Sequence, residues 1–323
     1  MDFTKYKNDF LGYLQENKYT QEPQNLYEPV NYILSIGGKR MRPILTLMSA
    51  ELFNESYDNA IPAAMAVEVF HNFTLLHDDI MDDAPLRRGQ ATVHEKWDVN
   101  TAILSGDVMM IYAYEFLRNY EPQLFAELMA VFNRTAIEVC EGQQMDVDFE
   151  DRNDVSIQEY MKMIKLKTSV LVACALKMGA LVGGASKQDA QAMYQFGLNL
   201  GLAFQLQDDY LDAFGNPETF GKQVGGDIIE NKKTYLYIEG LKTATAEDRK
   251  ALEQWFTLES FDQEKKIFEV KAIFERSGSK KAIQNEIEKY TDQAINDLEK
   301  LNLSEAKKDQ LKAFAHYLMK RKV

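Results

Sequence analysis

Apolar positions along the chain follow helical periods, and nearly all-apolar stretches alternate with amphipathic ones. Residues 62–81 carry apolar side chains on almost every face, as a helix surrounded by other helices does. Alternating strand patterns and Asn-Gly or Asp-Gly hairpin turns are absent from the sequence, so strands are not expected. The pattern predicts an all-α protein, with later helices near residues 102–118, 124–148, 156–183, 187–214 and 228–243.

Proline and glycine mark the expected ends of these helices. Pro23 and Pro29 are expected to separate a first helix from a second, and Pro62 and Pro85 to bound the apolar helix. The sequence has no linker, low-complexity tract or fixed-period repeat. We therefore predict one domain over residues 1–323, a helical bundle with buried inner helices and an amphipathic outer layer.

The charge balance and the cysteine count narrow the function classes. With 37 basic and 50 acidic residues the net charge is −13, which argues against a nucleic-acid partner. Two cysteines exclude a disulfide scaffold and fit a reducing compartment. The first residues show no secretory signal, and no uncharged apolar run reaches the roughly 18 residues of a transmembrane helix. We expect a cytoplasmic protein without a transmembrane segment.

Two acidic motifs with the same spacing each follow an apolar helical stretch. The first is Asp78-Asp79-Ile80-Met81-Asp82 and the second is Asp208-Asp209-Tyr210-Leu211-Asp212. Residues four apart share a helix face, where unpaired carboxylates repel one another. One such motif could be an ordinary solvated helix end, but two indicate that a cation relieves the repulsion. Carboxylates sharing a face are typical Mg²⁺ ligands, so the pair predicts a shared Mg²⁺ cluster that binds a diphosphate.

Basic residues gather near these acidic motifs in the sequence. They are Lys39 and Arg42 after a Gly37-Gly38 pair, Arg87 and Arg88 after the first motif, Lys167 in an apolar segment, and Lys222 and Lys232 after the second motif. A surface turn or plain salt bridges would explain each of them singly. Arginine forks onto phosphate oxygens, and His71 lies two helical turns before Asp78. Together they favour binding of Mg²⁺-bridged diphosphates.

With every motif in family order between Gly37 and Lys233, the chain resembles the trans-isoprenyl diphosphate synthases, the polyprenyl synthetase family. The resemblance implies a single isoprenoid-synthase helical bundle whose central helices surround a large active-site cavity. It also implies a prenyltransferase that joins isopentenyl diphosphate head-to-tail to dimethylallyl, geranyl or farnesyl diphosphate and releases pyrophosphate. Family members are usually homodimers, so the resemblance implies a homodimer here.

Site residues follow from the same resemblance. Three Mg²⁺ ions are implied, two held by Asp78 and Asp82 and one by Asp208, with Asp79, Asp209 and Asp212 in the same motifs. The allylic diphosphate is assigned to Arg87, Lys167, Lys222 and Lys232, and that of isopentenyl diphosphate to Lys39, Arg42, His71 and Arg88. Thr168, Gln205 and Asp146 join Lys167 where the allylic cation develops. The basic end, Lys320-Arg321-Lys322, is a weaker candidate for closing over the second diphosphate.

Product length depends, in this family, on the residues before the first aspartate. Phe73 and Thr74 stand five and four positions before Asp78, with Phe70 one turn earlier. The phenylalanines could be simple core residues. If Phe73 closes the end of the cavity into which the product chain grows, it favours a short product. Geranylgeranyl diphosphate is then the first candidate, farnesyl diphosphate the second, and a long-chain product comes after these.

Three other classes compete on the residues alone, and the paired motifs argue against the third, a plain helical interaction protein. A class I terpene cyclase shares the first acidic motif but normally carries a different second motif, and a non-catalytic prenyltransferase subunit tends to lose one of the two. Both motifs are intact here. The synthase is therefore the favoured interpretation, and the preferred allylic starter stays open.

Overall fold

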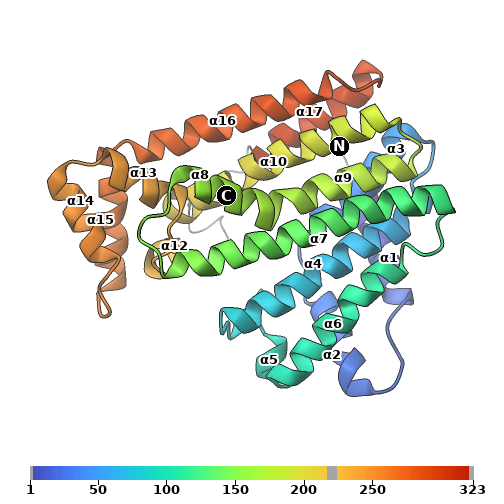
Figure 1. Cartoon of the computed structure of the whole chain (residues 1–323), viewed down its shortest axis with the longest axis horizontal. Coiled ribbons are helices and arrows are strands. Elements are labelled where there is room, and N and C mark those ends of the chain that lie inside the picture. Colours follow the sequence, from blue (N-terminus) through green and yellow to red (C-terminus); the bar gives the residue numbers. More distant parts are fainter. Residues whose placement is uncertain (1–2, 217–223, 320–323) are drawn as a thin grey trace. The chain divides into compact units, whose positions relative to one another are not determined.

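The computed structural model describes residues 3–216 and 224–319, and these are helical almost throughout (Figure 1). The all-α prediction is confirmed. From the start of the chain the elements are α1 (Thr4–Glu16), α2 (Gln24–Ser35), α3 (Met41–Phe53), the 3₁₀ turn η1 (Asp58–Ala60), α4 (Ile61–Met81), β1 (Leu86–Arg87), β2 (Gln90–Ala91), α5 (Val93–Lys96), α6 (Val99–Glu115) and α7 (Pro122–Glu150). They continue with α8 (Ile157–Ile164), the π-helical η2 (Lys165–Ser169), α9 (Val170–Val182), α10 (Lys187–Phe214), α12 (Gly226–Ile229), α13 (Tyr235–Thr243), α14 (Ala246–Trp255), α15 (Gln263–Arg276), α16 (Ser279–Leu298) and α17 (Glu305–Met319).

The chain folds into two compact units. The first unit comprises Met1–Thr135 and Cys174–Tyr194, and the second comprises Ala136–Ala173 and Gln195–Val323. Helices α7, α9 and α10 therefore contribute residues to both units. The single domain expected over residues 1–323 stays a prediction.

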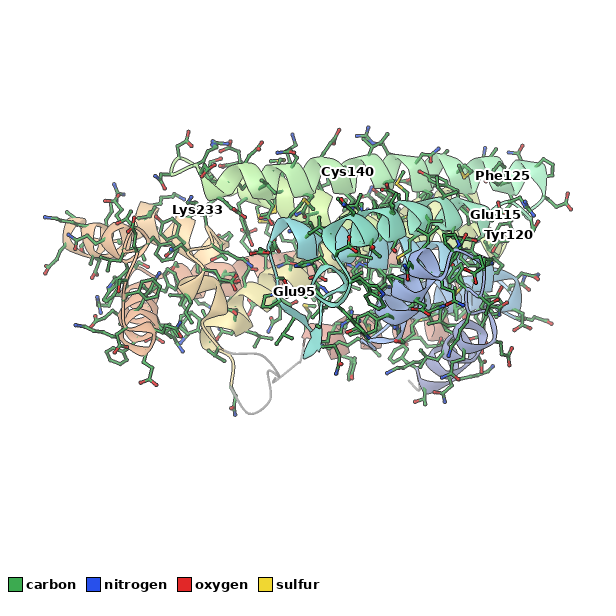
Figure 2. All side chains as sticks on the ribbon, turned by 90° about the horizontal axis from the view of Figure 1, so that it is seen from below. Glu95, Glu115, Tyr120, Phe125, Cys140 and Lys233 are labelled. Carbon is green, nitrogen blue, oxygen red and sulfur yellow. The ribbon has the colours of Figure 1, made fainter. Side chains whose placement is uncertain are left out.

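Helix α4 forms the core of the first unit. It packs beside α6 and α3 (Figure 1), and its residues from Ala63 to Val67 are fully buried. At its start, Tyr120, labelled in Figure 2, donates its hydroxyl hydrogen to the Asn59 carbonyl at 2.6 Å and accepts from the Ala63 amide at 3.2 Å. The Ala63 amide lies in the first turn of α4, where amides have no acceptor within the helix, and the Tyr120 hydroxyl provides one. The helix ends at Met81, as its apolar pattern predicted, so the first acidic motif lies in its last turn.

A two-residue hairpin follows α4, and the expectation that the chain has no hairpin was wrong. β1 and β2 pair antiparallel, with Arg87 opposite Gln90. The two turn residues, Arg88 and Gly89, both have positive φ, at 54° and 76°. This conformation is that of the tight turns whose twist suits a hairpin. The sequence pattern missed the turn because Arg-Gly fills the place usually taken by Asn-Gly.

The helix expected over residues 156–183 contains a π-helical turn, which lies in the second unit. Ser156 and Glu159 start α8 with reciprocal side-chain to backbone hydrogen bonds, and the π-turn η2 then carries Lys167 and Thr168. A Cβ on Gly142 of α7 would lie 2.6 Å from the Leu166 carbonyl carbon, and one on Gly201 of α10 would lie 2.8 Å from Ser169 Cα. The two glycines let α7 and α10 approach the π-turn closely.

Other boundaries differ from the sequence prediction for local reasons. Residues 228–243 form two helices, α12 and α13, rather than one. Lys233, in the break between them, donates to the Phe149 and Glu150 carbonyls at 2.9 and 2.6 Å and so caps the end of α7 (Figure 2). Asp98 caps the Thr101 amide at 2.9 Å, which starts α6 three residues earlier than expected.

Pro29 was expected to lie between the first two helices, but it lies inside α2. No disulfide joins Cys140 and Cys174, as their small number predicted. Among the described helices, none is both long enough and apolar enough to cross a membrane.

Candidate active site

In the first acidic motif the middle aspartate is turned inward. The Asp79 side chain is 2% exposed, while Asp78 is partly exposed and Asp82 exposed. Arg87 forms a bidentate ion pair with Asp79. Its Nε lies 2.7 and 2.8 Å from the two carboxylate oxygens, and a terminal nitrogen lies 2.6 Å from Oδ1. Burial raises the pKa of Asp79, and the Arg87 guanidinium opposes that rise. Arg87 is therefore a partner of the motif's own carboxylate, with Asp78 farther off at 3.7 Å.

The hairpin places Arg88 against the glycine pair at residues 37 and 38. Arg88 donates to the Gly37 carbonyl. Gly38 has a φ of 120°, and a Cβ there would lie 2.6 Å from the Arg88 guanidinium carbon. Glycine at position 38 thus provides both the backbone conformation and the space that Arg88 needs. The sequence signal for this contact was the glycine pair itself.

Three of the residues assigned to isopentenyl diphosphate lie in one basic cluster, which consists of Arg40, Arg42, His71 and Arg88. Arg42 lies 3.0 Å from His71 Nε2. The fourth assigned residue, Lys39, is exposed on the neighbouring turn. Buried Arg40 is paired with buried Glu68, a role the sequence did not indicate.

Burial and neighbouring positive charges lower the pKa values of three groups in this cluster. Burial lowers the pKa of Arg42 to about 10, with Arg88 adding to the effect. Burial and the surrounding arginines hold the pKa of His71 well below its ordinary 6.5, so the ring is neutral near pH 7. The pKa of Arg88 is lowered by burial and by Arg40. A nearby anion would favour the charged forms of these groups.

The second acidic motif repeats the inward-turned middle aspartate. Asp209 is 5% exposed, whereas Asp208 and Asp212 are partly exposed. Tyr160 donates its hydroxyl hydrogen to Asp209 Oδ2, and Gln205 donates to Oδ1 at 3.1 Å. Burial raises the pKa of Asp209 well above its ordinary value, and the negative charge of Asp227 raises it further. Gln205, which the resemblance placed beside the allylic cation, is thus also a partner of the motif.

Asp227 and Lys232 complete the surroundings of this motif. The Asp227 amide donates to Asp212 Oδ1 at 3.0 Å, and Lys232 Nζ lies 3.9 Å from Asp227 Oδ1 and 2.9 Å from Glu230 Oε2. Burial lowers the pKa of Lys232. The nearby carboxylates of Glu230 and Asp227 raise it by more in sum, so the net pKa lies above the ordinary value. Asp209, Asp212, Asp227 and Lys232 line one small pocket.

Lys167 pairs with an acidic residue of α7. Its Nζ lies 2.5 Å from Asp146 Oδ2 on α7. Both side chains are partly exposed, so the pair reaches solvent. Thr168 follows in the same π-turn. The π-turn therefore carries Lys167 to the Asp146 carboxylate, with Thr168 as the next residue.

Phe70 and Phe73 form an aromatic pair in α4. Their ring centroids are 5.6 Å apart, and Phe73 also lies 4.8 Å from the His77 ring, edge to face. Phe132 packs edge to face on Phe70 at 5.3 Å. The Thr74 hydroxyl donates to the His71 carbonyl at 2.8 Å. All three residues proposed to set product length are thus held in place by neighbours in the first unit.

Besides the role of Arg40, sequence reasoning missed the site residues Tyr160 and Asp227. Tyr160 lies seven residues before Lys167, a spacing that marks the same face of a regular helix, but only the fold shows its contact with Asp209. Asp227 follows two glycines in the sequence, and the acceptor of its amide hydrogen, Asp212, lies fifteen residues earlier. Lys222 and Lys320-Arg321-Lys322 lie outside the described residues.

The residues of each acidic motif fit a hard divalent cation. Their donors are carboxylate oxygens, the ligands that Mg²⁺ prefers. Around the second motif the carboxylates of Asp208, Asp209, Asp212 and Asp227 lie within one unit. Burial is the main cause of the raised pKa of Asp209, and the negative charges of Asp227 and Asp208 add to it. A bound cation would relieve the repulsion between them.

An all-helical fold with an Asp-Asp-x-x-Asp motif ending each of two apolar helices defines the isoprenoid-synthase class. Residues 23–274 match the polyprenyl synthetase family. The chain belongs to this family, and it is a prenyltransferase that condenses prenyl diphosphates. Enzymes of the family are generally Mg²⁺-dependent and use isopentenyl and allylic diphosphates.

Relatives and solved structures agree with this assignment. The chain is 36% identical to a geranylgeranyl pyrophosphate synthase of Geoglobus acetivorans, covering 95% of this chain and 94% of that protein. It is 39% identical to a geranylfarnesyl diphosphate synthase of Natronomonas pharaonis, over 69% and 71% of the two chains. The crystal structure of a geranylgeranyl pyrophosphate synthase superposes with a TM-score of 0.95 at 54% identity and covers 100% of both chains.

Proposed function

We propose that this enzyme joins isopentenyl diphosphate to allylic diphosphates and that its main product is geranylgeranyl diphosphate. The observation that supports this most directly is the repeated motif geometry. In each motif a protein partner turns the middle aspartate inward, Arg87 for Asp79 and Tyr160 for Asp209. The outer two aspartates of each motif share a helix face. The names of the similar synthases support the twenty-carbon product.

Within this proposal the aspartates bind three Mg²⁺ ions. Asp78 and Asp82 hold two, and Asp208 holds the third. Asp79, Asp209 and Asp212 support them from within the motifs. Bound Mg²⁺ neutralises negative charge that develops on the departing pyrophosphate.

Arginine and lysine side chains bind the two diphosphates in this proposal. Arg87, Lys167, Lys222 and Lys232 take the allylic diphosphate, and Lys39, Arg42, His71 and Arg88 take that of isopentenyl diphosphate. The low pKa of His71 in the basic cluster supports the second assignment, because a bound dianion would replace the repulsion among these groups with attraction.

The reaction itself needs no side-chain nucleophile. The bond from the allylic carbon to its diphosphate breaks, the double bond of isopentenyl diphosphate attacks that carbon, and pyrophosphate accepts the proton lost from the adduct. Thr168 and Gln205 present oxygen dipoles that stabilise the allylic cation, while the Lys167–Asp146 pair holds the π-turn in place. The cation has to form where water is excluded, because water would capture it.

The bulky Phe73 supports a short product. Its ring is fixed between Phe70 and His77, so it would block a chain growing along α4. A fifteen-carbon end point is the next candidate. A relative at 39% identity is named geranylfarnesyl diphosphate synthase, which makes a longer product the third candidate.

We further propose that the enzyme is a cytoplasmic homodimer. Helix α6 exposes Val99, Ile103, Leu104 and Ile111, and exposed apolar side chains gathered on one helix mark interaction surfaces. Sedimentation velocity of the full chain should show a dimer. Leu104→Glu should shift it toward monomer, whereas Phe268→Glu, at an exposed position on α15, should not.

Purified protein incubated with Mg²⁺, farnesyl diphosphate and labelled isopentenyl diphosphate tests the function. We expect incorporation that requires both substrates and Mg²⁺, with twenty carbons as the main end point after the phosphates are removed. Asp78→Asn and Asp208→Asn should each abolish most incorporation, whereas Asp107→Asn in α6 should not. Pyrophosphate release from the allylic substrate alone would indicate a cyclase, and release from neither mixture would contradict catalysis.

A further inference from the structure

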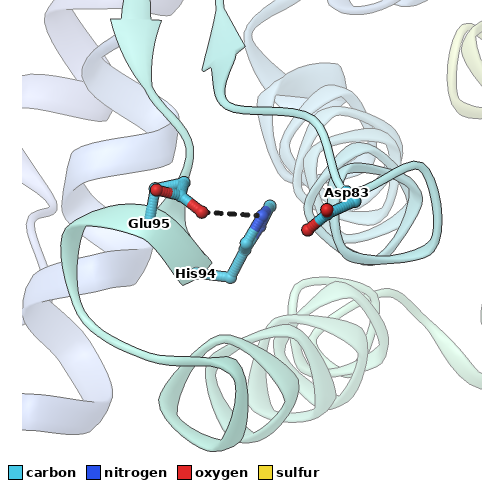
Figure 3. A group of neighbouring side chains, drawn as sticks. All are labelled: Asp83, His94 and Glu95. Atoms are coloured by element: carbon cyan, nitrogen blue, oxygen red, sulfur yellow. Dashed lines mark ion pairs between the residues drawn. The ribbon is translucent and has the colours of Figure 1, made fainter.

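Three side chains outside the assigned site converge at the base of the hairpin. Asp83 follows the first acidic motif, while His94 and Glu95 lie on α5 (Figure 3). One ligand atom from each lies within 4.8 Å of those from the other two. None of the three has a role in the reaction proposed above.

His94 is the unusual member of this group. Its side chain is 5% exposed, and within the described part of the chain neither ring nitrogen has a hydrogen-bond partner. The nearest carboxylate oxygen, Glu95 Oε1, is 3.8 Å from Nε2, which is too far for a hydrogen bond. Buried polar groups in native proteins are nearly always satisfied. An imidazole buried without a partner and facing two carboxylates therefore points to a ligand.

We propose that Asp83, His94 and Glu95 bind a divalent transition-metal ion such as Zn²⁺. One imidazole and two carboxylates suit Zn²⁺, whereas the all-oxygen acidic motifs suit Mg²⁺. Metal–ligand bonds of about 2.0–2.2 Å need the three donors somewhat closer together than they lie here. Asp83 and Glu95 are exposed, so both carboxylates have room to rotate toward the buried ring.

The hairpin holds these ligands close together before any metal binds. The Thr92 hydroxyl donates to the Ala84 carbonyl at 2.8 Å, and the Thr92 amide donates to the Pro85 carbonyl at 3.2 Å. These bonds close the base of the hairpin between Asp83 and His94. A metal ion there would clamp the hairpin that carries Arg87 and Arg88, so it would be a structural ion, distinct from those of the reaction.

Zn²⁺ binding to the full chain tests the proposal. Chelator-treated protein carrying Cys140→Ser, which removes an exposed thiol, is titrated with Zn²⁺ by calorimetry in a large excess of Mg²⁺. Asp83→Asn and Glu95→Gln are the informative variants. Asn tolerates the left-handed backbone at Asp83, where φ is 49°, and Glu95 is exposed, so neither change should impair folding. Asp78→Asn and His316→Gln serve as controls for the first acidic motif and for an exposed histidine.

We expect one Zn²⁺ per chain to bind in the presence of Mg²⁺. Asp83→Asn and Glu95→Gln should each weaken it roughly 10- to 100-fold, and Asp78→Asn and His316→Gln should leave it unchanged. Zn²⁺ should also raise the melting temperature of the Cys140→Ser protein, and by less in the two ligand variants. Absence of Zn²⁺ binding, binding that Asp83→Asn and Glu95→Gln leave unchanged, or binding lost in Asp78→Asn would overturn the proposal.

Discussion

Tyr160 donates its hydroxyl hydrogen to Asp209 Oδ2, so a phenol from α8 fixes the middle carboxylate of the second acidic motif. Arg87 does the same for Asp79 in the first motif. The two partners differ in chemistry, one neutral and one charged, but each turns an aspartate away from solvent. The outer aspartates of each motif are left on one face, where they can bind the same ligand.

Removal of the Tyr160 hydroxyl should destabilise the protein. In Tyr160→Phe the buried Asp209 loses a hydrogen bond, so we expect the free energy of unfolding to fall by about 1–3 kcal/mol. Urea unfolding followed by circular dichroism measures this loss. Tyr317→Phe, at an exposed position on α17, is the matched control and should change stability by less than about 0.5 kcal/mol. Equal loss in both variants would contradict a specific role for Tyr160.

Arg87→Lys should reduce activity although it keeps the charge. Lysine cannot reproduce the fork onto Asp79, and charge-assisted hydrogen bonds contribute about 1.5–3 kcal/mol. We therefore expect kcat/KM to fall roughly 10- to 100-fold. Steady-state kinetics at saturating Mg²⁺ measure this effect. Arg118→Lys, in an exposed pair with Glu115, should leave kcat/KM unchanged, and an active Arg87→Lys enzyme would show that charge alone suffices.

Gly142→Ala should disturb the π-turn. A Cβ at this position would overlap backbone atoms of Leu166 and Lys167, and overpacking of this kind costs about 1–3 kcal/mol. Chemical unfolding should show the loss, and kcat should fall because Lys167 and Thr168 move with their backbone. Gly12→Ala, where a Cβ meets nothing within 4 Å, is the control and should be neutral or slightly stabilising. Full activity in Gly142→Ala would mean that the π-turn tolerates displacement.

Phe73→Ala should lengthen the product. The change removes the ring that stands between Phe70 and His77 and leaves room for a longer prenyl chain. Chromatography of dephosphorylated products should show end points beyond twenty carbons. Phe268→Ala, at an exposed position on α15, should not alter the distribution. An unchanged twenty-carbon end point in Phe73→Ala would assign the ring to the core instead.

Stability should decline on acidification in a way that depends on His71. Burial and Arg42 hold the pKa of His71 well below 6.5 in the folded protein, whereas the unfolded chain has a pKa of about 6.5. Below that pH the unfolded state binds the extra proton, so the free energy of unfolding falls as pH drops. Between pH 7 and about pH 5.5 the titration of His71 should lower the free energy of unfolding by about 1 kcal/mol. His71→Gln should flatten this dependence relative to wild type, and an unchanged slope in this variant would contradict the prediction.

Local chemistry explains why much of this protein could be predicted from its sequence. The apolar helix ending at Met81 and the helix from Lys187 to Phe214 were predicted correctly because their apolar faces and end residues are local signals. Both acidic motifs were found because a four-residue spacing on a helix already places two carboxylates on one face. The family, too, could be inferred from the order of such motifs.

Tertiary structure decided the features that join residues far apart in the chain. The hairpin at Arg88 and Gly89 needs a left-handed backbone at a residue that usually avoids it, and its contact with Gly37 supports that choice. The π-turn exists where Gly142 and Gly201 allow close packing, and Tyr160 meets Asp209 across 49 residues. Periodicity records which face of a helix is apolar, but it does not record which polar group another helix brings to that face. The sequence by itself therefore determined the helices, the motifs and the family, and the packing of distant segments decided how each motif's middle carboxylate is held.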